Sequence, residues 1–577
     1  MTRRNRAAAA AFPLLAAMAA MAATARGHEG QSRVSVDSSG AEGDGRSGAT
    51  AAAAISSNGR YVAFESEAGN LVGNDLNSVS DVFVRDRVAG VTIRVSVDSS
   101  GVEANGGSFA PALSGDGRFV AFHSDADNLI ASDTNGVADV FVHDRDPDGN
   151  GVFDEGNGET KRVSVKSDGT HGNGRSRFPS ISSDGAKVVF ASEATNLVDN
   201  DNNRVSDVFL HDRGAGTTTR VSVSSAGVEG DGDSRLASIS PGGAFVGFQS
   251  LATNLVASDG NGRADVFVRD LAGGVTSRVS VDSSGTEGNN HSFGPPALST
   301  DGAFVAFWSL ASNLVTSDTN STTDIFVRQI STGSTTRVSV TSSGAQVFGG
   351  SRLPAISGDG RIVAFESDAS DLVPGDVNGA RDIFLRDRAA STTTLVTVNC
   401  VGVQADGASI LATVSSDGQL VAFSSDATNL VAHDRNAVTD VILLDRAVSD
   451  TDASWRNYGA GYPGKNGIPG FTASADPVIG TSLSLLVDNS RAAWTVGFVL
   501  VGWNSASIPT SSGGTLLVDF AFIEPVALPP GGGVLPIDIP VDPAVCGFAA
   551  YFQVVEIDPG ARYGLSFTPG LELICGH

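Results

Sequence analysis

Carboxylate and amide side chains recur at a fixed spacing along most of this 577-residue chain. The motif Asp-x-Asn-x-x-x-Asp occurs seven times, as Asp75-Asn77-Asp81, Asp133-Asn135-Asp139, Asp201-Asn203-Asp207, Asp259-Asn261-Asp265, Asp318-Asn320-Asp324, Asp376-Asn378-Asp382 and Asp434-Asn436-Asp440. Oxygen ligands at alternate positions of a turn suit a hard cation such as Ca²⁺. However, the copies lack the glycine and the bidentate glutamate of a helix–loop–helix calcium loop, and Asp and Asn also close turns by binding their own backbone. The motif therefore predicts a structural turn, with calcium binding as the weaker alternative.

One insertion resembles a calcium loop more closely. Residues 146–155 read Asp-Pro-Asp-Gly-Asn-Gly-Val-Phe-Asp-Glu, which places the candidate ligands Asp146, Asp148, Asn150 and Asp154 at loop positions 1, 3, 5 and 9. The backbone carbonyl of Val152 is a further candidate. Position twelve is Asn157 rather than glutamate, so any affinity for Ca²⁺ would be modest. An acidic, solvated hairpin tip is the alternative.

The motif belongs to a longer repeat that sets the architecture. A Val-Ala-Phe-like strand ends at Phe64, Phe122, Phe190, Phe248, Phe307, Phe365 and Phe423, so successive copies are 58, 68, 58, 59, 58 and 58 residues apart. Each copy has four short apolar runs separated by polar turns; in the second copy these are 109–114, 118–124, 139–144 and 161–165. Val140, Phe141 and Val142 are all apolar, so both faces of the sheet must be covered. Blades of a β-propeller meet this requirement.

The ends of the repeat indicate how the ring closes. Arg-Val-Ser-Val begins at residues 33, 94, 162, 220, 278 and 337, and Leu395 begins a seventh version. The first copy precedes any complete repeat, and the last repeat stops after Asp445 without one. We therefore expect Val34–Val36 to supply the outer strand of the seventh blade, since an open sheet edge would leave backbone groups unpaired.

Ser-x-Asp-Gly-Arg-x-Val-Ala-Phe followed by Asp-Val-Phe-Val-x-Asp-Arg resembles the TolB-type, WD-repeat-like β-propeller family, over roughly three quarters of the mature chain. The resemblance implies a rigid, disc-shaped binding scaffold in the cell envelope or outside it. It implies no single ligand, because this fold carries many functions.

Strand direction predicts which loops share a face of the disc. The Asp-x-Asn-x-x-x-Asp loops and the loops between blades lie on one side, because successive strands alternate in direction. The inter-blade loops carry seven equivalent residues, Glu42, Glu103, His171, Glu229, Glu287, Gln346 and Gln404. We expect an acidic, amide-rich face there, suited to a cation, a sugar or a basic peptide.

Composition and the first residues predict an exported protein. Residues 1–25 have the basic start, apolar stretch and small-residue cleavage site of a signal peptide. A net charge of −26 argues against nucleic acid or anionic membrane as a partner. No later segment has the apolar length of a membrane span. The mature chain is expected to be a soluble monomer, secreted or periplasmic in a bacterial envelope.

The sequence contains few signs of catalysis. Among the 8 histidines, His143 and His211 occupy a repeat position that is arginine in most other copies, which indicates exchangeable surface bases. No Gly-x-Ser-x-Gly motif is present. A catalytic carboxylate pair stays open, but the sequence favours a protein that is not an enzyme.

Composition changes after the repeats. We expect the propeller at 26–449, a Gly- and Pro-rich linker at 450–470 and a β-sandwich at 471–577, with strands at 482–487, 494–501, 515–520, 534–539, 549–555 and 563–567. The tail resembles C-terminal β domains of secreted bacterial proteins, which implies no defined activity. Cys546 and Cys575 could form a disulfide, whereas Cys400 fills a small-residue position. Trp494 and Trp503 are expected in the core rather than against a sugar.

The leading hypothesis is a secreted, non-catalytic, seven-bladed propeller with a C-terminal β-sandwich. It would bind a protein or peptide through the acidic loop face, with Ca²⁺ stiffening at least the 146–155 loop. The alternative is a propeller that binds carbohydrate or processes it as a hydrolase or lyase.

Overall fold

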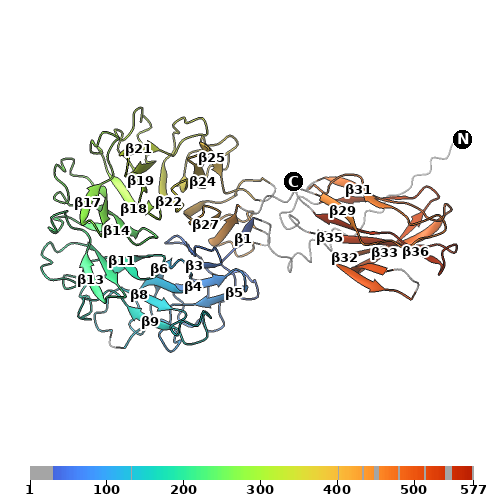
Figure 1. The fold of residues 1–577 in the computed structure, drawn as a ribbon, viewed down its shortest axis with the longest axis horizontal. Coiled ribbons are helices and arrows are strands. Elements are labelled where there is room, and N and C mark those ends of the chain that lie inside the picture. The colour runs from blue at the N-terminus through green and yellow to red at the C-terminus, as the bar shows by residue number, and fades with distance from the viewer. Residues whose placement is uncertain are drawn as a thin grey trace.

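The computed structural model describes residues 30–131, 133–399, 402–431, 434–446, 454–478, 481–511, 515–539 and 549–574. These residues form β-strands, turns and loops but no helix, and hence no helix of the length and apolarity that a membrane crossing needs. Seven four-stranded antiparallel sheets within the described residues form a ring, which Figure 1 shows as the blue-to-brown part of the chain. The chain is therefore an all-β protein containing a seven-bladed β-propeller, as the repeat predicts. The signal peptide, Cys400, Cys546 and Cys575 lie outside the described residues.

Each blade takes its strands from one repeat, and the last blade combines the two ends of the ring. Blades 1 to 4 consist of β2 (Ala54–Ile55), β3 (Tyr61–Ser66), β4 (Asp81–Asp86) and β5 (Val91–Arg94); β6 (Ser108–Leu113), β7 (Phe119–Ser124), β8 (Asp139–Asp144) and β9 (Glu159–Arg162); β10 (Ser176–Ile181), β11 (Lys187–Ser192), β12 (Asp207–Asp212) and β13 (Thr217–Arg220); and β14 (Ser234–Ile239), β15 (Phe245–Ser250), β16 (Asp265–Asp270) and β17 (Val275–Arg278). Blades 5 to 7 consist of β18 (Ser292–Leu298), β19 (Phe304–Ser309), β20 (Asp324–Gln329) and β21 (Ser334–Arg337); β22 (Ser351–Ile356), β23 (Ile362–Ser367), β24 (Asp382–Asp387) and β25 (Thr392–Leu395); and β26 (Ser409–Val414), β27 (Leu420–Ser425), β28 (Asp440–Asp445) and β1 (Gln31–Arg33).

The Val-Ala-Phe and Asp-Val-Phe strands form the middle of every blade. Phe64 of β3 lies opposite Phe83 of β4, and their rings stack with centroids 5.9 Å apart. Both side chains are fully buried and pack in one cluster with Leu420 and Val441 of blade 7. Burying each phenylalanine contributes on the order of 1.5–3 kcal/mol. The apolar residues on both faces of the strand thus join neighbouring blades.

The chain's N-terminal segment closes the ring, as predicted. β1 pairs with β28 in the register Gln31↔Leu444 to Arg33↔Ile442, and the backbone N–H of Val34 continues this pairing by donating to Val441. The strand lies slightly earlier than predicted because the Ser35 hydroxyl, rather than a backbone carbonyl, accepts from the backbone N–H of Val441, at 3.1 Å; the same hydroxyl donates to Asp440 at 2.5 Å. The outer strands of blades 1 to 5 end at the equivalent arginine, and that of blade 6 ends at Leu395.

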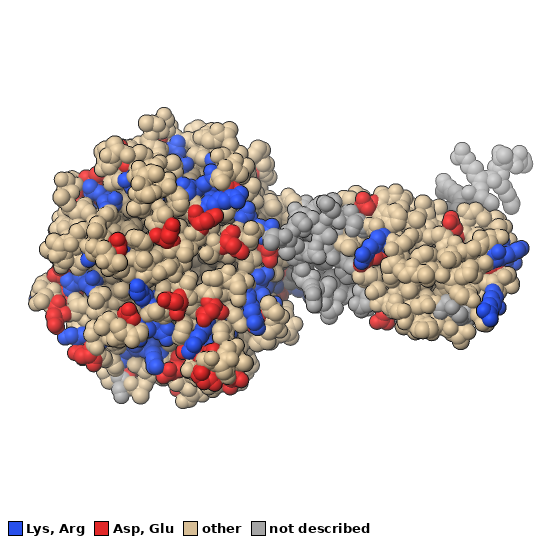
Figure 2. Space-filling model, in the orientation of Figure 1, with Lys and Arg blue, Asp and Glu red and all other residues tan. Residues whose placement is uncertain are grey.

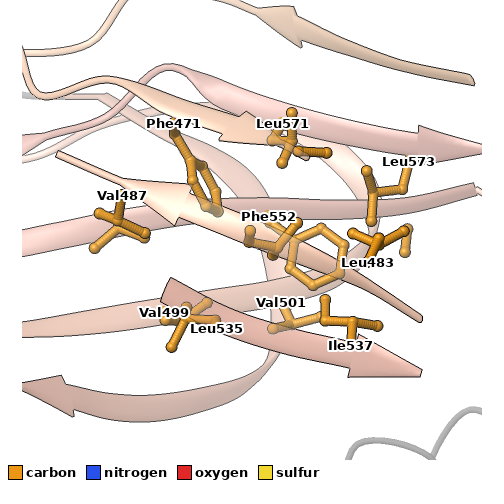
Figure 3. Packing of buried hydrophobic residues seen from close by; sticks show 14 of the residues in the cluster. Phe471, Leu483, Val487, Val499, Val501, Leu535, Ile537, Phe552, Leu571 and Leu573 are labelled. Carbon is orange, nitrogen blue, oxygen red and sulfur yellow. The ribbon is translucent and has the colours of Figure 1, made fainter. Parts of the chain in front are cut away.

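The C-terminal strands form two sheets with a shared core. The larger sheet contains β29 (Ser454–Tyr458), β37 (Gly570–Ile574), β35 (Ala549–Ile557), β32 (Thr495–Pro509), β33 (Thr515–Leu528) and β36 (Leu565–Phe567), and the smaller contains β30 (Phe471–Ala473), β31 (Ser482–Val487) and β34 (Gly533–Asp538). Phe471, Leu483 and Leu535 of the smaller sheet pack against Phe552 and Leu571 of the larger one (Figure 3). This is the arrangement of a β-sandwich.

Two details of this region differ from the sequence interpretation. β29 lies inside the segment predicted as a linker, because Ser454–Tyr458 pairs with β37 at the end of the chain. Trp494 is 67% exposed rather than in the core, since it stands just before β32 begins. The side chain of Trp503 lies outside the described part of the structure.

Candidate functional site

The Asp-x-Asn-x-x-x-Asp loops and the inter-blade loops lie on one face of the ring, which we call the loop face. In blade 1 the motif joins β3 to β4, and the inter-blade loop follows β5, so both start from the same end of the antiparallel sheet. In every blade, a β-bridge fixes the inter-blade loop residue that the sequence predicts to contact a bound molecule; in blade 1 this bridge joins Val97 and Glu103. The equivalent bridges hold Glu42, His171, Glu229, Glu287, Gln346 and Gln404.

An arginine lies among the carboxylates of this face. In blade 1 the Nη1 atom of Arg94 is 3.8 Å from Asp75, 3.4 Å from Asp81 and in direct contact with Glu103. The same arrangement recurs around Arg33, Arg220 and Arg278. The carboxylate oxygens of Asp75, Asp81 and Glu103 lie within 4.8 Å of one another, as a metal site would require. The guanidinium group therefore provides, within the protein, the positive charge that a bound cation would supply.

Hydrogen bonds within the motif explain its spacing. Asn77 accepts from the backbone N–H of Val79 and donates to Asp81 at 3.0 Å and to the carbonyl of Ala104 at 2.9 Å. Asp81 is fully buried and also accepts from Ser96 at 2.5 Å. The motif thus closes its own turn and ties it to the next loop, which supports the structural interpretation of the repeated motif.

Burial raises the pKa of several carboxyl groups in these clusters. The pKa of Asp75 rises to about 6, because burial and the neighbouring Asp81 carboxylate both disfavour its ionised form. The pKa values of Asp259 and Asp434 also rise to about 6, again with burial as the largest cause. The clusters therefore take up protons at a mildly acidic pH.

The residues predicted to contact a ligand are engaged within the blades. Glu103 accepts from the backbone N–H of Leu76 at 3.1 Å in addition to its contact with Arg94. In blade 2, His171 Nδ1 lies 2.5 Å from Arg162, which also binds Asp133 at 3.1 Å and Asp139 at 2.5 Å. Gln346 of blade 5 donates to Asp318 at 2.9 Å. On the face of the ring that Figure 2 shows, acidic and basic side chains are interspersed.

Blade 6 departs from this pattern. Leu395 stands at the arginine position and Gln404 at the glutamate position. The amide of Gln404 donates to Asp376 at 2.8 Å and to Asp382 at 3.0 Å. Two buried carboxylates are thus held by a neutral amide where other blades use a guanidinium group.

The 146–155 insertion folds back on its own blade. Asp146 accepts from the backbone N–H groups of Asn150 and Gly151, both at 3.0 Å. Asp154 pairs with Arg145 at 2.5 Å, and the Arg145 side chain is 1% exposed. The guanidinium of Arg145 also lies 4.6 Å from the ring centroid of Tyr61. Asp154 therefore neutralises a buried arginine, an interaction that the calcium-like spacing does not reveal.

The two histidines at the arginine position are not surface bases. His143 and His211 are 5% and 7% exposed, and each Nδ1 contacts a threonine of the neighbouring strand, at 2.8 and 2.9 Å. Burial lowers the pKa of His143 to about 4, so its ring is neutral at pH 7. The repeat position is internal, which the sequence alone did not indicate.

A charged network on blade 6 is also absent from the sequence prediction. Glu366, 1% exposed, lies 3.2 Å from Arg381, which pairs with Asp368 at 2.9 Å; Arg352 contacts Asp368 as well. The residue after the repeated phenylalanine varies among the blades, and Glu366 occupies that position. This variation within an otherwise regular repeat is the sequence feature that could have indicated the charged network.

No protein-family model and no curated protein matches this sequence. Among solved structures, a putative TolB from Agrobacterium tumefaciens matches with 17% identity over 53% of this chain and 83% of its own, with a TM-score of 0.32. Prolyl oligopeptidase B from Galerina marginata matches with 10% identity and a TM-score of 0.39, over 78% of this chain and 56% of its own. A periplasmic gluconolactonase from Pseudomonas aeruginosa matches with 13% identity and a TM-score of 0.29, over 78% of this chain and 95% of its own. These likenesses concern the fold alone, and the narrower resemblance to TolB-type proteins stays a prediction.

The prediction that the chain is not an enzyme is corrected by this comparison, because prolyl oligopeptidase B and gluconolactonase are enzymes. The sequence argument relied on missing serine-nucleophile and histidine signals, which test only some classes of reaction. A fold does not fix a function, and loops of a propeller can carry catalytic groups. The fold of this chain is therefore compatible with catalysis.

Proposed function

We propose that this protein binds a protein or peptide through an apolar patch on the loop face of blade 6. The surface comprises Phe348, Val377 and Val403, which stand on the loops of this blade and are 82%, 84% and 49% exposed; we call them the blade-6 patch. Large exposed apolar side chains gathered on one face of a protein mark interaction sites. An exposed aromatic ring is a common anchor for a partner.

Hydrogen bonds hold the three residues on one loop system. The backbone N–H of Phe348 donates to Asp371, at 3.2 Å from one oxygen, at the start of the loop that joins β23 to β24. Val377 lies in the same loop and donates to Gln404 at 3.0 Å. Val403 directly precedes Gln404. The patch is thus supported by the loop geometry of a single blade.

The departure of Phe348 from the repeat is the observation that carries this proposal. The equivalent residues are polar in the other copies: Asp44, Asn105, Asn173, Asp231, Asn289 and Asp406. In several blades this residue binds its neighbouring loop, as Asp44 does by accepting from the backbone N–H of Gly69 at 2.8 Å. A phenylalanine cannot replace that side-chain bond, so its place on the surface is better explained by contact with a partner.

The glutamates of the inter-blade loops are not part of the proposed surface, because they already bind arginines within the blades. The charged network of Arg352, Asp368 and Arg381 would form a polar border to the patch. The pattern of residues 1–25 supports a proposed site of action in the bacterial envelope or outside the cell. Ca²⁺ binding by the 146–155 loop stays a prediction, with Asp154 already engaged by Arg145.

Site-specific photo-crosslinking tests this function. A photoreactive phenylalanine analogue replaces Phe348 or Val377 in the full chain, which is then irradiated with an envelope extract. We expect the same crosslinked species from both positions. The matched control is Val88, 77% exposed in the turn between β4 and β5 on the opposite face. Equal crosslinking at Val88, or none at the patch, would contradict the proposal.

Substitution provides the second part of the test. Phe348→Asp and Val377→Asp should each weaken capture of the crosslinked partner by at least about tenfold, as expected for a residue at the centre of an interface. Val88→Asp should leave capture unchanged. Undiminished capture by both patch variants would exclude this surface.

A further inference from the structure

Two acidic side chains of the C-terminal β-sandwich lie buried beside each other at the end of β35. Glu556 is 1% exposed and Asp558 is 0% exposed. Glu556 stands opposite Ser566 of β36, and Asp558 begins the turn that leads to Gly564. Their hydrogen-bond contacts are with hydroxyl and backbone N–H groups.

The hydroxyl protons are too few for the oxygen contacts in this cluster. Ser490 Oγ lies 2.6 Å from Glu556 Oε2, 3.0 Å from Asp558 Oδ2 and 2.9 Å from Ser566 Oγ. Ser566 Oγ lies 2.9 Å from the same Glu556 oxygen. Each hydroxyl carries one proton, so two protons serve four oxygen–oxygen contacts. The cluster is therefore short of protons for its oxygen–oxygen contacts.

The second carboxylate oxygen of Glu556 provides an independent observation. Glu556 Oε1 is buried and has no hydrogen-bond partner among the described residues. An unpaired carboxylate oxygen is costly to bury. A cation bound by Oε1 and by the crowded oxygens would pair Oε1 and supply the positive charge that the missing protons do not.

The surrounding backbone completes a compact site. The backbone N–H of Lys465 donates to Asp558 at 2.5 Å, and that of Gly560 donates to its other oxygen at 2.9 Å. A Cβ at Gly464 would collide with Ser490 Oγ and Asp558 Oδ2, so the chain can pass this close only with glycine there. Although burial opposes it, these hydrogen bonds lower the pKa of Asp558 and keep the group ionised at neutral pH.

We propose that Glu556, Asp558, Ser490 and Ser566 form a calcium site in the C-terminal β-sandwich. The donor set contains only oxygen, which suits a hard cation and not zinc or copper. Two carboxylates balance a divalent charge. Ca²⁺ accepts irregular coordination, whereas Mg²⁺ requires an octahedral shell and usually retains several waters.

Calorimetric titration of the chelator-treated full chain with CaCl₂ tests this site. We expect saturable binding and a higher melting temperature of the C-terminal transition. The isosteric variants Glu556→Gln and Asp558→Asn should each weaken binding by at least about tenfold, because affinity follows the number of charged ligands. The matched control Asp148→Asn changes an exposed carboxylate of the 146–155 loop and should leave this binding intact.

Three results would overturn the proposal. The first is undiminished Ca²⁺ binding by Glu556→Gln, and the second is loss of binding in Asp148→Asn alone. The third is a wild-type chain that binds no Ca²⁺. If Asp558→Asn fails to fold, Ser566→Ala serves as the second variant and should also weaken binding.

Discussion

Blades 1 and 6 use different side chains to balance the same buried charge. In blade 1, three carboxylates surround Arg94, which leaves two negative charges; in blade 6, Asp376 and Asp382 alone leave the same two. The arginine and the glutamate are thus both absent from blade 6, while the Asp-x-Asn-x-x-x-Asp motif is retained. The comparison teaches that hydrogen bonds of the motif close the turn without the arginine, and that the glutamate occurs only in blades that keep the arginine.

The same two blades differ at the surface. Leu76 of blade 1 and Val377 of blade 6 are equivalent residues with nearly equal exposure, 85% and 84%. Blade 6 also has Phe348, 82% exposed, where the other copies have Asp or Asn. The blade that lacks the internal ion pair thus carries an exposed phenylalanine at a position that is polar in the other repeats.

Removing the arginine from blade 1 should have the largest effect. Arg94→Met leaves Asp81 buried without its countercharge, which is expected to cost about 3–5 kcal/mol of unfolding free energy. Leu395→Met at the equivalent position of blade 6 should cost less than about 1.5 kcal/mol. Denaturant unfolding measures both, and equal small losses would show that the Arg94 cluster has no structural role.

A smaller loss is expected in blade 2, where the insertion supplies the countercharge. Asp154→Ala removes the partner of the buried Arg145, and we expect a loss of about 1.5–3 kcal/mol. Asp148→Ala, in the same loop but exposed, should change stability by less than about 0.5 kcal/mol. A larger effect of Asp148→Ala in calcium-containing buffer would instead favour a metal-binding role for the loop.

The effect of pH on stability should be smaller than the effect of either substitution. Asp75, Asp259 and Asp434 have a pKa of about 6 in the folded chain and an ordinary value of 3.8. As the pH falls, the folded state therefore binds these protons before the unfolded state does. The stabilisation of the folded state by the three groups is fully present below pH 3.8 and is lost as the pH rises through about 6. Wild-type protein should gain melting temperature between pH 7.5 and pH 5.

The control for this pH effect is the triple variant Asp75→Asn, Asp259→Asn, Asp434→Asn, whose gain over the same interval should be smaller. An equal gain would assign the pH dependence to other groups.

Repetition made the fold predictable from sequence, since seven copies of one strand pattern specify sheets that must be covered on both faces. The closing segment followed from counting Arg-Val-Ser-Val copies. The site was less accessible, because side-chain spacing does not reveal which residue from another strand will meet a carboxylate. Arg94 lies on the outer strand and Glu103 in the following loop, and only the folded blade brings them to Asp81.

The most direct test of the central claim, that the loop-face glutamates balance internal arginines, converts blade 1 to the blade-6 arrangement. Denaturant unfolding compares Arg94→Leu, Glu103→Gln and the double variant. The account predicts a large loss for Arg94→Leu and a recovery of at least about 1 kcal/mol when Glu103→Gln is added, as coupled neighbours show. Strictly additive losses would contradict it.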